Sequence, residues 1–542
     1  MAVYGRPNRD GTGSAATQFA DSISACGATR APRVHQAVVD VEVVGDVVAD
    51  FDAAAAHWPH RPAVVHNGTS STYWELASQV WRTALRYRAT GFGGDESPGL
   101  VGALVSHTPA AAEHLLGILR AGGVYCPIDA ALPPARRQTL ATVLGLDGFH
   151  PATAGPGGPS QEHDADAPAA DIDPPSAGGD HPAYVLCTSG STGAPKPVVV
   201  SRRALTATVR ALRHLFGLTP GDRVLQFASL GWDTCLEEIL PALTAGATLV
   251  FDDGAHSGSM PRFVRTLAEQ EITVLDLPTA FWHELVLYLS EERAALPAGV
   301  RLVVIGGERV DPTRLRQWRE LDLGHIRLLN TYGCTETTMI THAVQLAGPG
   351  TEPEVVSCQA EAPLGRALPH VRDHITDDGE LFVSGPSLAT GYLGLPESTA
   401  TGFPVVDRGC GPTRWFRTGD LVIRGEAGLL FSRGRADEQV KVLGVRVHPA
   451  EVEAQLNSHP AVAGAVVVGE QLLGRTALTA YVALLGDTSA AALKAYLRER
   501  LPSQFVPATV KFVAALAYTS SGKVDRAATR RAALDCEQGA GL

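Results

Sequence analysis

The sequence predicts an α/β protein with a large N-terminal domain of parallel, helix-covered sheets, a small β subdomain and a small α+β domain at the C-terminus. Between residues 222 and 330 apolar runs alternate with helical patterns, and repeated strand–helix units build mainly parallel sheets. After about residue 380 short strands with glycine turns indicate the β subdomain. A compact α+β tail follows Gly434–Asp437, where we place the boundary.

Hydrophobic periodicity justifies the elements in order. A helix is expected from Ser71 through Leu85, then a buried strand at Val101–Val105 and a helix at Ala110–Arg120 that stops at Ala121-Gly122-Gly123. The next strands are expected at Arg223–Phe227, Ala247–Phe251, Ile272–Asp276, Arg301–Ile305 and Ile326–Asn330, with helices at Cys235–Leu243, Thr279–Leu289 and Pro312–Leu321. The last elements are strands at Glu380–Val383, Trp415–Arg417, Leu421–Arg424, Leu429–Ser432, Ala463–Val468 and Thr479–Leu484, and helices at Glu451–Asn457 and Ser489–Arg500.

Two segments lack this periodicity. Residues 1–45 are rich in Gly, Ala and polar residues, which indicates a mobile leader. Residues 151–182 are dominated by Pro, Gly, Ala and Asp, a composition typical of a linker-like insertion. The chain is therefore predicted to consist of a leader (1–45), a large domain (46–434) and a small domain (435–542).

Composition narrows the class of protein. The net charge of −12 argues against nucleic acid or an anionic membrane as partner. No apolar run reaches membrane-spanning length, and the N-terminus lacks the apolar core of a signal peptide, so we expect a cytoplasmic protein. The eight cysteines include no C-x-x-C pair, which favours reduced thiols over a disulfide framework or a zinc site.

The stretch Tyr184–Lys196 reads Y-V-L-C-T-S-G-S-T-G-A-P-K. A strand entering a loop of glycines and hydroxyls can present backbone N–H groups to phosphates, and Lys196 adds a positive charge. Spacing alone leaves a flexible connector equally open, and Pro195 stands where a Walker loop requires another residue. The order T-S-G-S-T-G-x-P-K resembles the phosphate loop of the adenylate-forming superfamily: acyl-CoA synthetases, luciferases and the adenylation domains of nonribosomal peptide synthetases. One departure is Pro197, where the family usually has Gly. The resemblance implies ATP binding by Thr188, Ser189, Gly190, Ser191, Thr192, Gly193 and Lys196.

A second group of residues lies where strands are expected to end. In parallel sheets, ligands bind beyond the carboxyl ends of the strands. That rule selects Asp276, Gly306, Gly307, Thr331 and Tyr332. The carboxylate of Glu336 follows, and beside a phosphate loop it suits Mg²⁺, although a lone T-E pair is more often a helix start capped by Thr335. The segment resembles the family motif Y-G-x-T-E, which implies that Tyr332 stacks on adenine, Thr335 contacts the α-phosphate and Glu336 holds the metal.

Three further motifs occur in the family's order, so the resemblance covers about residues 46–530. The T-G-D motif implies that Asp420 binds the ribose hydroxyls. The segment G-R-A-D-E-Q-V-K resembles the hinge, with Arg435 at the nucleotide and Asp437 as pivot. The segment S-S-G-K-V-D-R implies that Lys523 reaches the reacting carboxylate and the α-phosphate, offsetting charge there. The implied reaction uses ATP and Mg²⁺. A carboxylate attacks the α-phosphorus and expels pyrophosphate, the small domain turns, and a thiol attacks the adenylate.

The substrate is indicated by F-A-S-L-G-W-D-T-C-L-E-E, which resembles the substrate helix of the peptide synthetases. There an Asp binds the ammonium group of an amino acid, and Asp233 occupies that position. The other pocket positions, carried across one by one, are Thr234, Glu237, Asp276, Val304, Gly306, Thr331, Met339 and Ile340, closed by Lys523. Two alternatives stay open: Glu237 as a solvated helix residue, and Asp276 as the cap of the helix at Thr279.

Three carboxylates in one half-buried pocket remain ionised readily only with cations between them. A diamino acid supplies two such cations, its two ammonium groups. The pocket string D-T-E-D-V-G-T-M-I-K resembles the signature for β-lysine, with lysine second and ornithine third. Only 19 residues follow Lys523 and no L-G-G-x-S site occurs, so we expect transfer to a separate phosphopantetheinylated carrier protein. The alternatives are an acid–CoA ligase of the same fold and a catalytically silent binding module.

Overall fold

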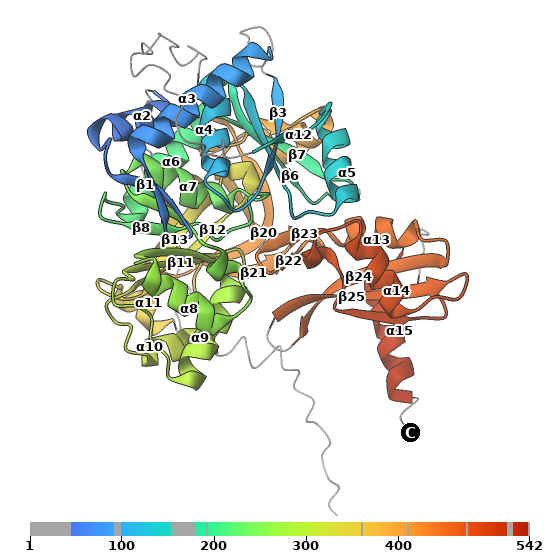
Figure 1. The fold of residues 1–542 in the computed structure, drawn as a ribbon. Coiled ribbons are helices and arrows are strands. Elements are labelled where there is room, and N and C mark those ends of the chain that lie inside the picture. The colour runs from blue at the N-terminus through green and yellow to red at the C-terminus, as the bar shows by residue number, and fades with distance from the viewer. Residues whose placement is uncertain are drawn as a thin grey trace, which may run out of the picture. The chain divides into compact units, whose positions relative to one another are not determined.

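A computed structural model describes residues 45–91, 99–152, 179–190, 193–358, 361–408, 411–472, 475–517 and 524–539. The predicted leader and nearly all of the predicted insertion lie outside these residues, as do Ser191, Thr192 and Lys523. All described residues belong to one compact unit. Their elements, labelled in Figure 1, confirm the predicted α/β class.

The largest sheet has nine strands in the order β14-β13-β12-β11-β10-β8-β9-β1-β2. Its inner strands, from β12 to β1, run parallel, and antiparallel strands complete both edges. The predicted run of parallel strands is therefore confirmed. The bounds are β1 (Pro62–His66), β2 (Thr69–Thr72), β8 (Arg223–Leu225), β9 (Thr248–Phe251), β10 (Val274–Pro278), β11 (Leu302–Gly306), β12 (Arg327–Gly333), β13 (Ile340–Ala347) and β14 (Arg366–Ala367).

Two sets of helices cover the two faces of this sheet. On one face lie α8 (Met260–Glu269), α9 (Thr279–Glu292) and α10 (Pro312–Glu320) (Figure 1), which share a core with Leu275 and Leu277 of β10. On the other face α7 (Thr234–Thr244) shares a core with Val274. Because successive strand residues point to opposite faces, Asp276 points toward the α7 side.

The second sheet has six strands in the order β17-β7-β6-β4-β3-β5. The apolar run before the phosphate loop forms β6, which pairs antiparallel with β7 on the far side of the loop. The bounds are β3 (Leu100–Val105), β4 (Val124–Asp129), β5 (His150–Pro151), β6 (Pro182–Thr188), β7 (Lys196–Ser201) and β17 (Gly391–Tyr392). Helices of this half are α2 (Val47–His57), α3 (Tyr73–Ala89), α4 (Ala110–Ala121), α5 (Pro134–Leu144) and α6 (Arg202–Phe216).

A four-stranded antiparallel sheet confirms the predicted β subdomain. Its strands are β15 (Arg372–Ile375), β16 (Glu380–Ser384), β20 (Phe416–Arg424) and β21 (Leu430–Arg435). The prediction of two strands around residues 415–424 is wrong, because one continuous strand spans them. Gly419 adopts a positive φ of 73° within this strand, so the T-G-D motif kinks without leaving the sheet. Short flanking elements are α11 (Pro353–Ser357), α12 (Pro396–Gly402), β18 (Val405–Asp407) and β19 (Pro412–Arg414).

The remaining elements form the α+β tail, which has its own hydrophobic core around Val452, Leu456 and Leu493. They are β22 (Val440–Val442), β23 (Val445–Val447), α13 (Pro449–Asn457), β24 (Val462–Leu472), β25 (Arg475–Leu484), α14 (Ala490–Arg498), β26 (Thr509–Phe512) and α15 (Arg526–Gly539). The predicted boundary at residues 434–435 falls at the end of β21 and stays a prediction. Among the described helices, none is both long and apolar enough to cross a membrane.

Candidate functional site

The predicted phosphate loop joins β6 to β7, and Thr188 pairs with Lys196 across its base. A Cβ at Gly190 would lie 2.0 Å from the carbonyl oxygen of Ala194, so only glycine allows the loop to fold back on itself. Lys196 Nζ lies 5.6 Å from the ring centroid of Tyr392. The described part of the loop is thus compact, with its lysine ammonium against an aromatic face.

Glu336 lies in a three-residue 3₁₀ turn, Thr335–Thr337, that follows β12. Thr335 does not cap a helix here, because Cys334 occupies the cap position. Glu336 is only 5% exposed, and both of its carboxylate oxygens are engaged. Oε1 accepts a hydrogen bond from the Tyr392 hydroxyl at 3.1 Å, and Oε2 pairs with Arg446 Nη1 at 2.8 Å.

These residues fit Mg²⁺ held together with nucleotide phosphates. Mg²⁺ commonly takes one or two protein carboxylates and completes its shell with phosphate oxygens and water. Glu336 supplies one such carboxylate, and the cationic Arg446 beside it shows that this position stabilises positive charge. Elsewhere in the described part of the chain, no group of three or more His, Cys, Asp or Glu side chains is arranged to hold a metal ion.

The residues predicted to hold the nucleoside meet at one point. The Tyr332 hydroxyl donates to Asp420 Oδ2 at 2.6 Å, and Arg435 Nη1 pairs with Asp420 Oδ1 at 2.6 Å. Arg435 Nε also pairs with Asp437 Oδ1 at 2.6 Å. Three motifs that are far apart in the sequence therefore form one hydrogen-bonded chain, with the predicted pivot at its end.

The residues of the predicted substrate pocket lie on four adjacent strands, β10 to β13, on the residue before β13 and at the start of helix α7. Asp276 of β10 pairs with Val304 of β11, and Gly306 of β11 pairs with Thr331 of β12. Ile340, at the start of β13, pairs with Gly333, the last residue of β12. The other members are Asp233 and Thr234 at the start of α7, Glu237 in its first turn, and Met339 immediately before β13.

The structure decides both alternatives about the acids. Glu237 is 8% exposed, so it is not a solvated helix residue. Asp276 is 5% exposed and does not cap α9, whose N-cap position is Pro278. Nor does Asp233 cap α7 through its side chain. Two of their oxygens, Asp233 Oδ2 and Asp276 Oδ2, are buried and without a hydrogen-bond donor among the described residues.

Burial governs the electrostatics of this acid cluster, which we define as Asp233, Glu237 and Asp276. Burial raises the pKa of Asp233, and a hydrogen bond from Thr335 partly lowers it. Burial also raises the pKa of Glu237 well above its usual range, and the charges of Asp276 and Asp233 raise it further. The pKa of Asp276 rises through burial to about 7, although its hydrogen bond with Glu237 lowers it. An unpaired negative charge is therefore costly here.

The neighbouring acid Glu238 has a different, structural role. Its Oε1 accepts hydrogen bonds from the backbone N–H groups of Phe227 and Ala228, each at 3.0 Å. Its Oε2 accepts from Gln226 Nε2 at 3.0 Å. Glu238 thus anchors the segment that leads into α7, which fixes the direction in which Glu237 points.

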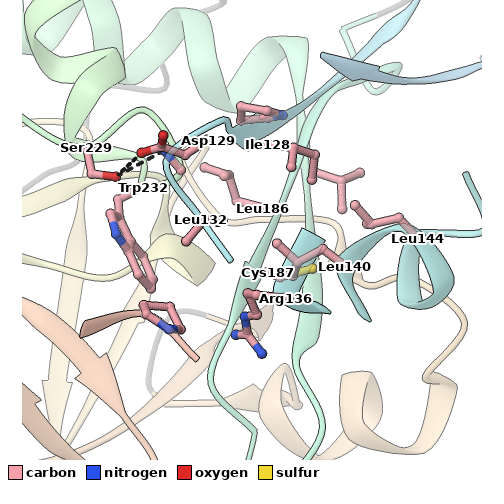
Figure 2. Close-up of a pocket in the computed structure, with 14 residues that line it drawn as sticks. Ile128, Asp129, Leu132, Arg136, Leu140, Leu144, Leu186, Cys187, Ser229 and Trp232 are labelled. Atoms are coloured by element: carbon pink, nitrogen blue, oxygen red, sulfur yellow. Dashed lines mark hydrogen bonds between the residues drawn. The ribbon is translucent and has the colours of Figure 1, made fainter. Parts of the chain in front are cut away.

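A pocket elsewhere in the large domain has Trp232 in its wall (Figure 2). Its wall carries Leu132, Leu140 and Cys187, and Ser229 donates to Asp129 Oδ2 at 3.0 Å. The acid cluster does not contribute to this wall. We assign the pocket no chemistry.

Two residues of the site were missed by the sequence argument, Tyr392 and Arg446. Arg446 lies on the β22–β23 hairpin, which folds back onto the phosphate loop. Ser189 Oγ donates to the carbonyl oxygen of Arg446 at 2.8 Å and accepts from the backbone N–H of His448 at 3.1 Å. The same hairpin brings Gly444 against Gly307, where a Cβ would lie 3.0 Å from Gly444 Cα. No local spacing in the sequence indicates these contacts.

Gly306→Ala is expected to damage the pocket. The new Cβ would lie 2.5 Å from Thr331 Oγ1, which donates to the Ile305 carbonyl at 2.9 Å. We expect a loss of about 1–3 kcal/mol in unfolding free energy, typical of overpacking, and a higher KM for the amino acid. Thermal unfolding and pyrophosphate exchange measure both. The control is Gly299→Ala, where the nearest atom is 3.9 Å away. Equal behaviour of the two variants would contradict the tight packing at Gly306.

Most of the chain is similar to known proteins. The family described as AMP-binding enzyme matches residues 51–148 and 141–393, and its C-terminal domain matches residues 451–523. An isonitrile lipopeptide synthase of Streptomyces coeruleorubidus is 41% identical over 491 residues, which cover 87% of this chain and 32% of that protein. A probable non-canonical nonribosomal peptide synthetase, CymA, of Salinispora arenicola is 36% identical over 90% of this chain and 6% of its own length. The chain thus spans a third or less of these relatives.

Solved structures share the fold. An artificially fused adenylation–PCP di-domain from Klebsiella oxytoca, NpsA-ThdA, superposes with a TM-score of 0.74 at 23% identity, covering 87% of this chain and 94% of that one. Holo-PA1221, a peptide synthetase protein with adenylation and PCP domains bound to a vinylsulfonamide inhibitor, gives 0.74 at 25% identity, covering 90% and 84%. The chain therefore belongs to the AMP-binding enzyme family, and its relatives confirm the resemblance to the adenylation domains of nonribosomal peptide synthetases.

Proposed function

We propose that this protein activates a diamino acid, with β-lysine as the best candidate, as an aminoacyl adenylate and transfers it to the phosphopantetheine thiol of a carrier protein. The observation that carries the proposal is the acid cluster. Glu237 and Asp276 are buried and Asp233 is half-buried, and one oxygen each of Asp233 and Asp276 is buried without a hydrogen bond from the described residues. Such groups are stable only when something positive or hydrogen-bonding fills the space.

In the first step Asp233 holds the amine nearest the substrate carboxylate, and Glu237 and Asp276 hold the distal amine. Asp233 contacts Thr335, so the carboxylate of the bound substrate lies next to the Thr335–Glu336 turn. A carboxylate oxygen attacks the α-phosphorus of ATP in line, and the bond to pyrophosphate breaks. Glu336 would hold Mg²⁺, which would supply neutralisation of the phosphate charge. The acids and the phosphate loop also accelerate the reaction, because they hold the carboxylate and the α-phosphate in position for attack.

In the second step the carrier thiol attacks the carbonyl carbon of the adenylate, and AMP leaves. The β22–β23 hairpin supports this step, because it contacts Ser189, Gly307 and Glu336. In that position the Arg446 guanidinium pairs with Glu336, the residue that would hold Mg²⁺. Rotation of the small domain about Asp437 would move the hairpin away from the phosphate loop and bring Lys523 to that place.

Two alternatives are weaker. L-lysine and ornithine also carry two amines, so they rank second and third as substrates. An acid–CoA ligase of the same fold is disfavoured, because a fatty or aryl acid has no amine to pair with Asp233, whose Oδ2 is buried without a hydrogen bond from the described residues. The curated relatives compared above are peptide synthetases.

Pyrophosphate exchange across β-lysine, lysine, ornithine, arginine, phenylalanine and a fatty acid tests the substrate class. We expect strong exchange with β-lysine and little with phenylalanine or the fatty acid. Exchange with the last two alone would remove the acid cluster from substrate recognition. Parallel thioester assays with CoA and with a phosphopantetheinylated carrier test the acceptor, and preferred loading of CoA would contradict the proposed carrier.

Arg446→Ala is expected to lower the Mg²⁺ concentration at which exchange saturates, by roughly tenfold. Arg446 and Mg²⁺ compete for Glu336, and a hydrogen bond to a charged group is worth about 1.5–3 kcal/mol. Carrier loading should fall in the same variant, because the hairpin loses its anchor. The control is Arg433→Ala, which removes an ion pair with Glu361 outside the site. An unchanged Mg²⁺ dependence would contradict the competition.

A further inference from the structure

Glu237 and Asp276 are both buried, and they lie close enough for each to shift the pKa of the other. Two carboxylates cannot hydrogen-bond to each other unless one carries a proton. Glu237 comes from the first turn of α7, and Asp276 from the middle of β10 on the face toward that helix. Two buried acids that are held this close from two sides favour a state in which one of them keeps its proton.

The groups that face the pair are acidic or neutral. From α7 and the residue before it come Asp233, Cys235 and Glu238, and from β6 comes Tyr184. Burial raises the pKa of Cys235 and of Tyr184 well above their usual ranges, so both stay neutral. The neighbouring positions on β11 and β12 are the uncharged Val304, Gly306 and Thr331. The strongest charges acting on Glu237 are those of other acids.

Asp276 Oδ2 adds an independent observation. The atom is buried, and no amide, hydroxyl or cationic donor among the described residues reaches it. In contrast, Glu238 has donors for both oxygens. The buried oxygen that lacks a hydrogen-bond donor thus belongs to the pair of Glu237 and Asp276.

We propose that Glu237 and Asp276 bind the distal ammonium of the substrate as one unit that retains its shared proton and presents a single negative charge. This inference rests on the proposed function. Asp233 supplies the second negative charge, so two ammonium groups meet two negative charges, and the buried pocket is neutral when occupied. A doubly ionised pair would leave one excess charge in a site that is poorly solvated.

Single amide replacements distinguish this arrangement from two independent carboxylates. In Glu237→Gln the amide N–H₂ can donate to Asp276 as the protonated acid does, and in Asp276→Asn the amide can donate to Glu237. We expect each single variant to keep kcat/KM for the diamino acid within roughly threefold of wild type. The double variant has no charge left and should lose far more than the product of the two single effects.

The pH profile provides a second readout that needs no variant. The pKa of Asp276 lies at about 7, so below that pH the pair takes up a second proton and becomes neutral. Affinity for the distal ammonium is therefore present above about pH 7 and is lost as the pH falls. We expect kcat/KM for β-lysine to drop about tenfold per pH unit on that side. For 3-aminohexanoic acid, which lacks the distal amine, the drop should be absent.

The experiment is exchange with β-lysine and 3-aminohexanoic acid between about pH 5.5 and 8.5, using wild type, both single variants, the double variant and Glu291→Gln, an exposed control. We expect a small loss of kcat/KM in each single variant and a large loss in the double variant. We also expect kcat/KM to fall at acidic pH with β-lysine and not with 3-aminohexanoic acid. Single variants as severe as the double, or equal pH profiles, would overturn the shared proton while the proposed function stands. No exchange by wild type with any diamino acid would instead overturn the proposed function. Thermal unfolding identifies variants that fail to fold.

Discussion

The double variant Glu237→Gln/Asp276→Asn should lose roughly 30-fold to several-thousand-fold in kcat/KM for a diamino acid. Truncating one partner of a buried charge pair typically costs about 2–5 kcal/mol, and every 1.4 kcal/mol is tenfold. Both acids are buried, so water cannot replace them. The KM for ATP should change little, because Tyr332, Asp420 and Arg435 form a separate cluster. Exchange kinetics with each substrate varied in turn measure both effects.

The matched control for this variant is Glu291→Gln/Glu292→Gln, two exposed acids at the end of α9. It removes the same number of charges and should leave both KM values unchanged. Unchanged diamino acid kinetics in the pocket variant would place Glu237 and Asp276 outside substrate recognition. An equal rise in the KM for ATP would indicate general damage to the domain.

Lys523→Ala is expected to lower the rate of adenylate formation by about 10²–10³, while ATP still binds. Removing one donor aimed at developing charge typically costs that much. Lys523 lies outside the described residues, but the segment after it is anchored. Asp525 Oδ1 accepts from the backbone N–H of Ala528 at 2.8 Å, and Arg526 Nη2 pairs with Glu453 Oε2 at 2.6 Å. The described chain therefore resumes directly after Lys523 in an anchored segment.

Single-turnover formation of the adenylate, combined with ATP binding by calorimetry, separates the two parts of this prediction. Lys494→Ala, on α14 of the same tail, is the control and should retain the wild-type rate. Near-normal adenylation by the Lys523 variant would remove this residue from the mechanism. Loss of ATP binding would assign it to nucleotide affinity instead.

Much of the fold follows from local patterns. The strands β10, β11 and β12 were predicted because short apolar runs end at polar or glycine positions, and strand register then brings Asp276, Val304 and Thr331 together. The spacing of four residues places Glu237 on the same helix face as Asp233, but only the structure shows that Glu237 is buried. Motifs that depend on one strand end or one helix turn are predictable in this way.

What could not be predicted depends on contacts between distant segments. Arg446 reaches Glu336, 110 residues away in sequence, because a hairpin folds back, and no periodicity records that. Tyr392 contacts both Lys196 and Glu336 through the edge strand β17. The continuous strand β20 was divided in the prediction because Gly419 suggests a turn, whereas pairing with β16 and β21 keeps the strand intact.

The central claim is that the acid cluster selects a second ammonium group, and one ratio tests it most directly. This is kcat/KM for β-lysine divided by kcat/KM for 3-aminohexanoic acid in wild-type pyrophosphate exchange at pH 8. The two substrates share the carboxylate and the nearby amine and differ only at the distal end. We predict a ratio of at least roughly 30, from a lost buried contact worth about 2 kcal/mol or more. A ratio near one would contradict the account, because the buried acids would then bind no distal ammonium.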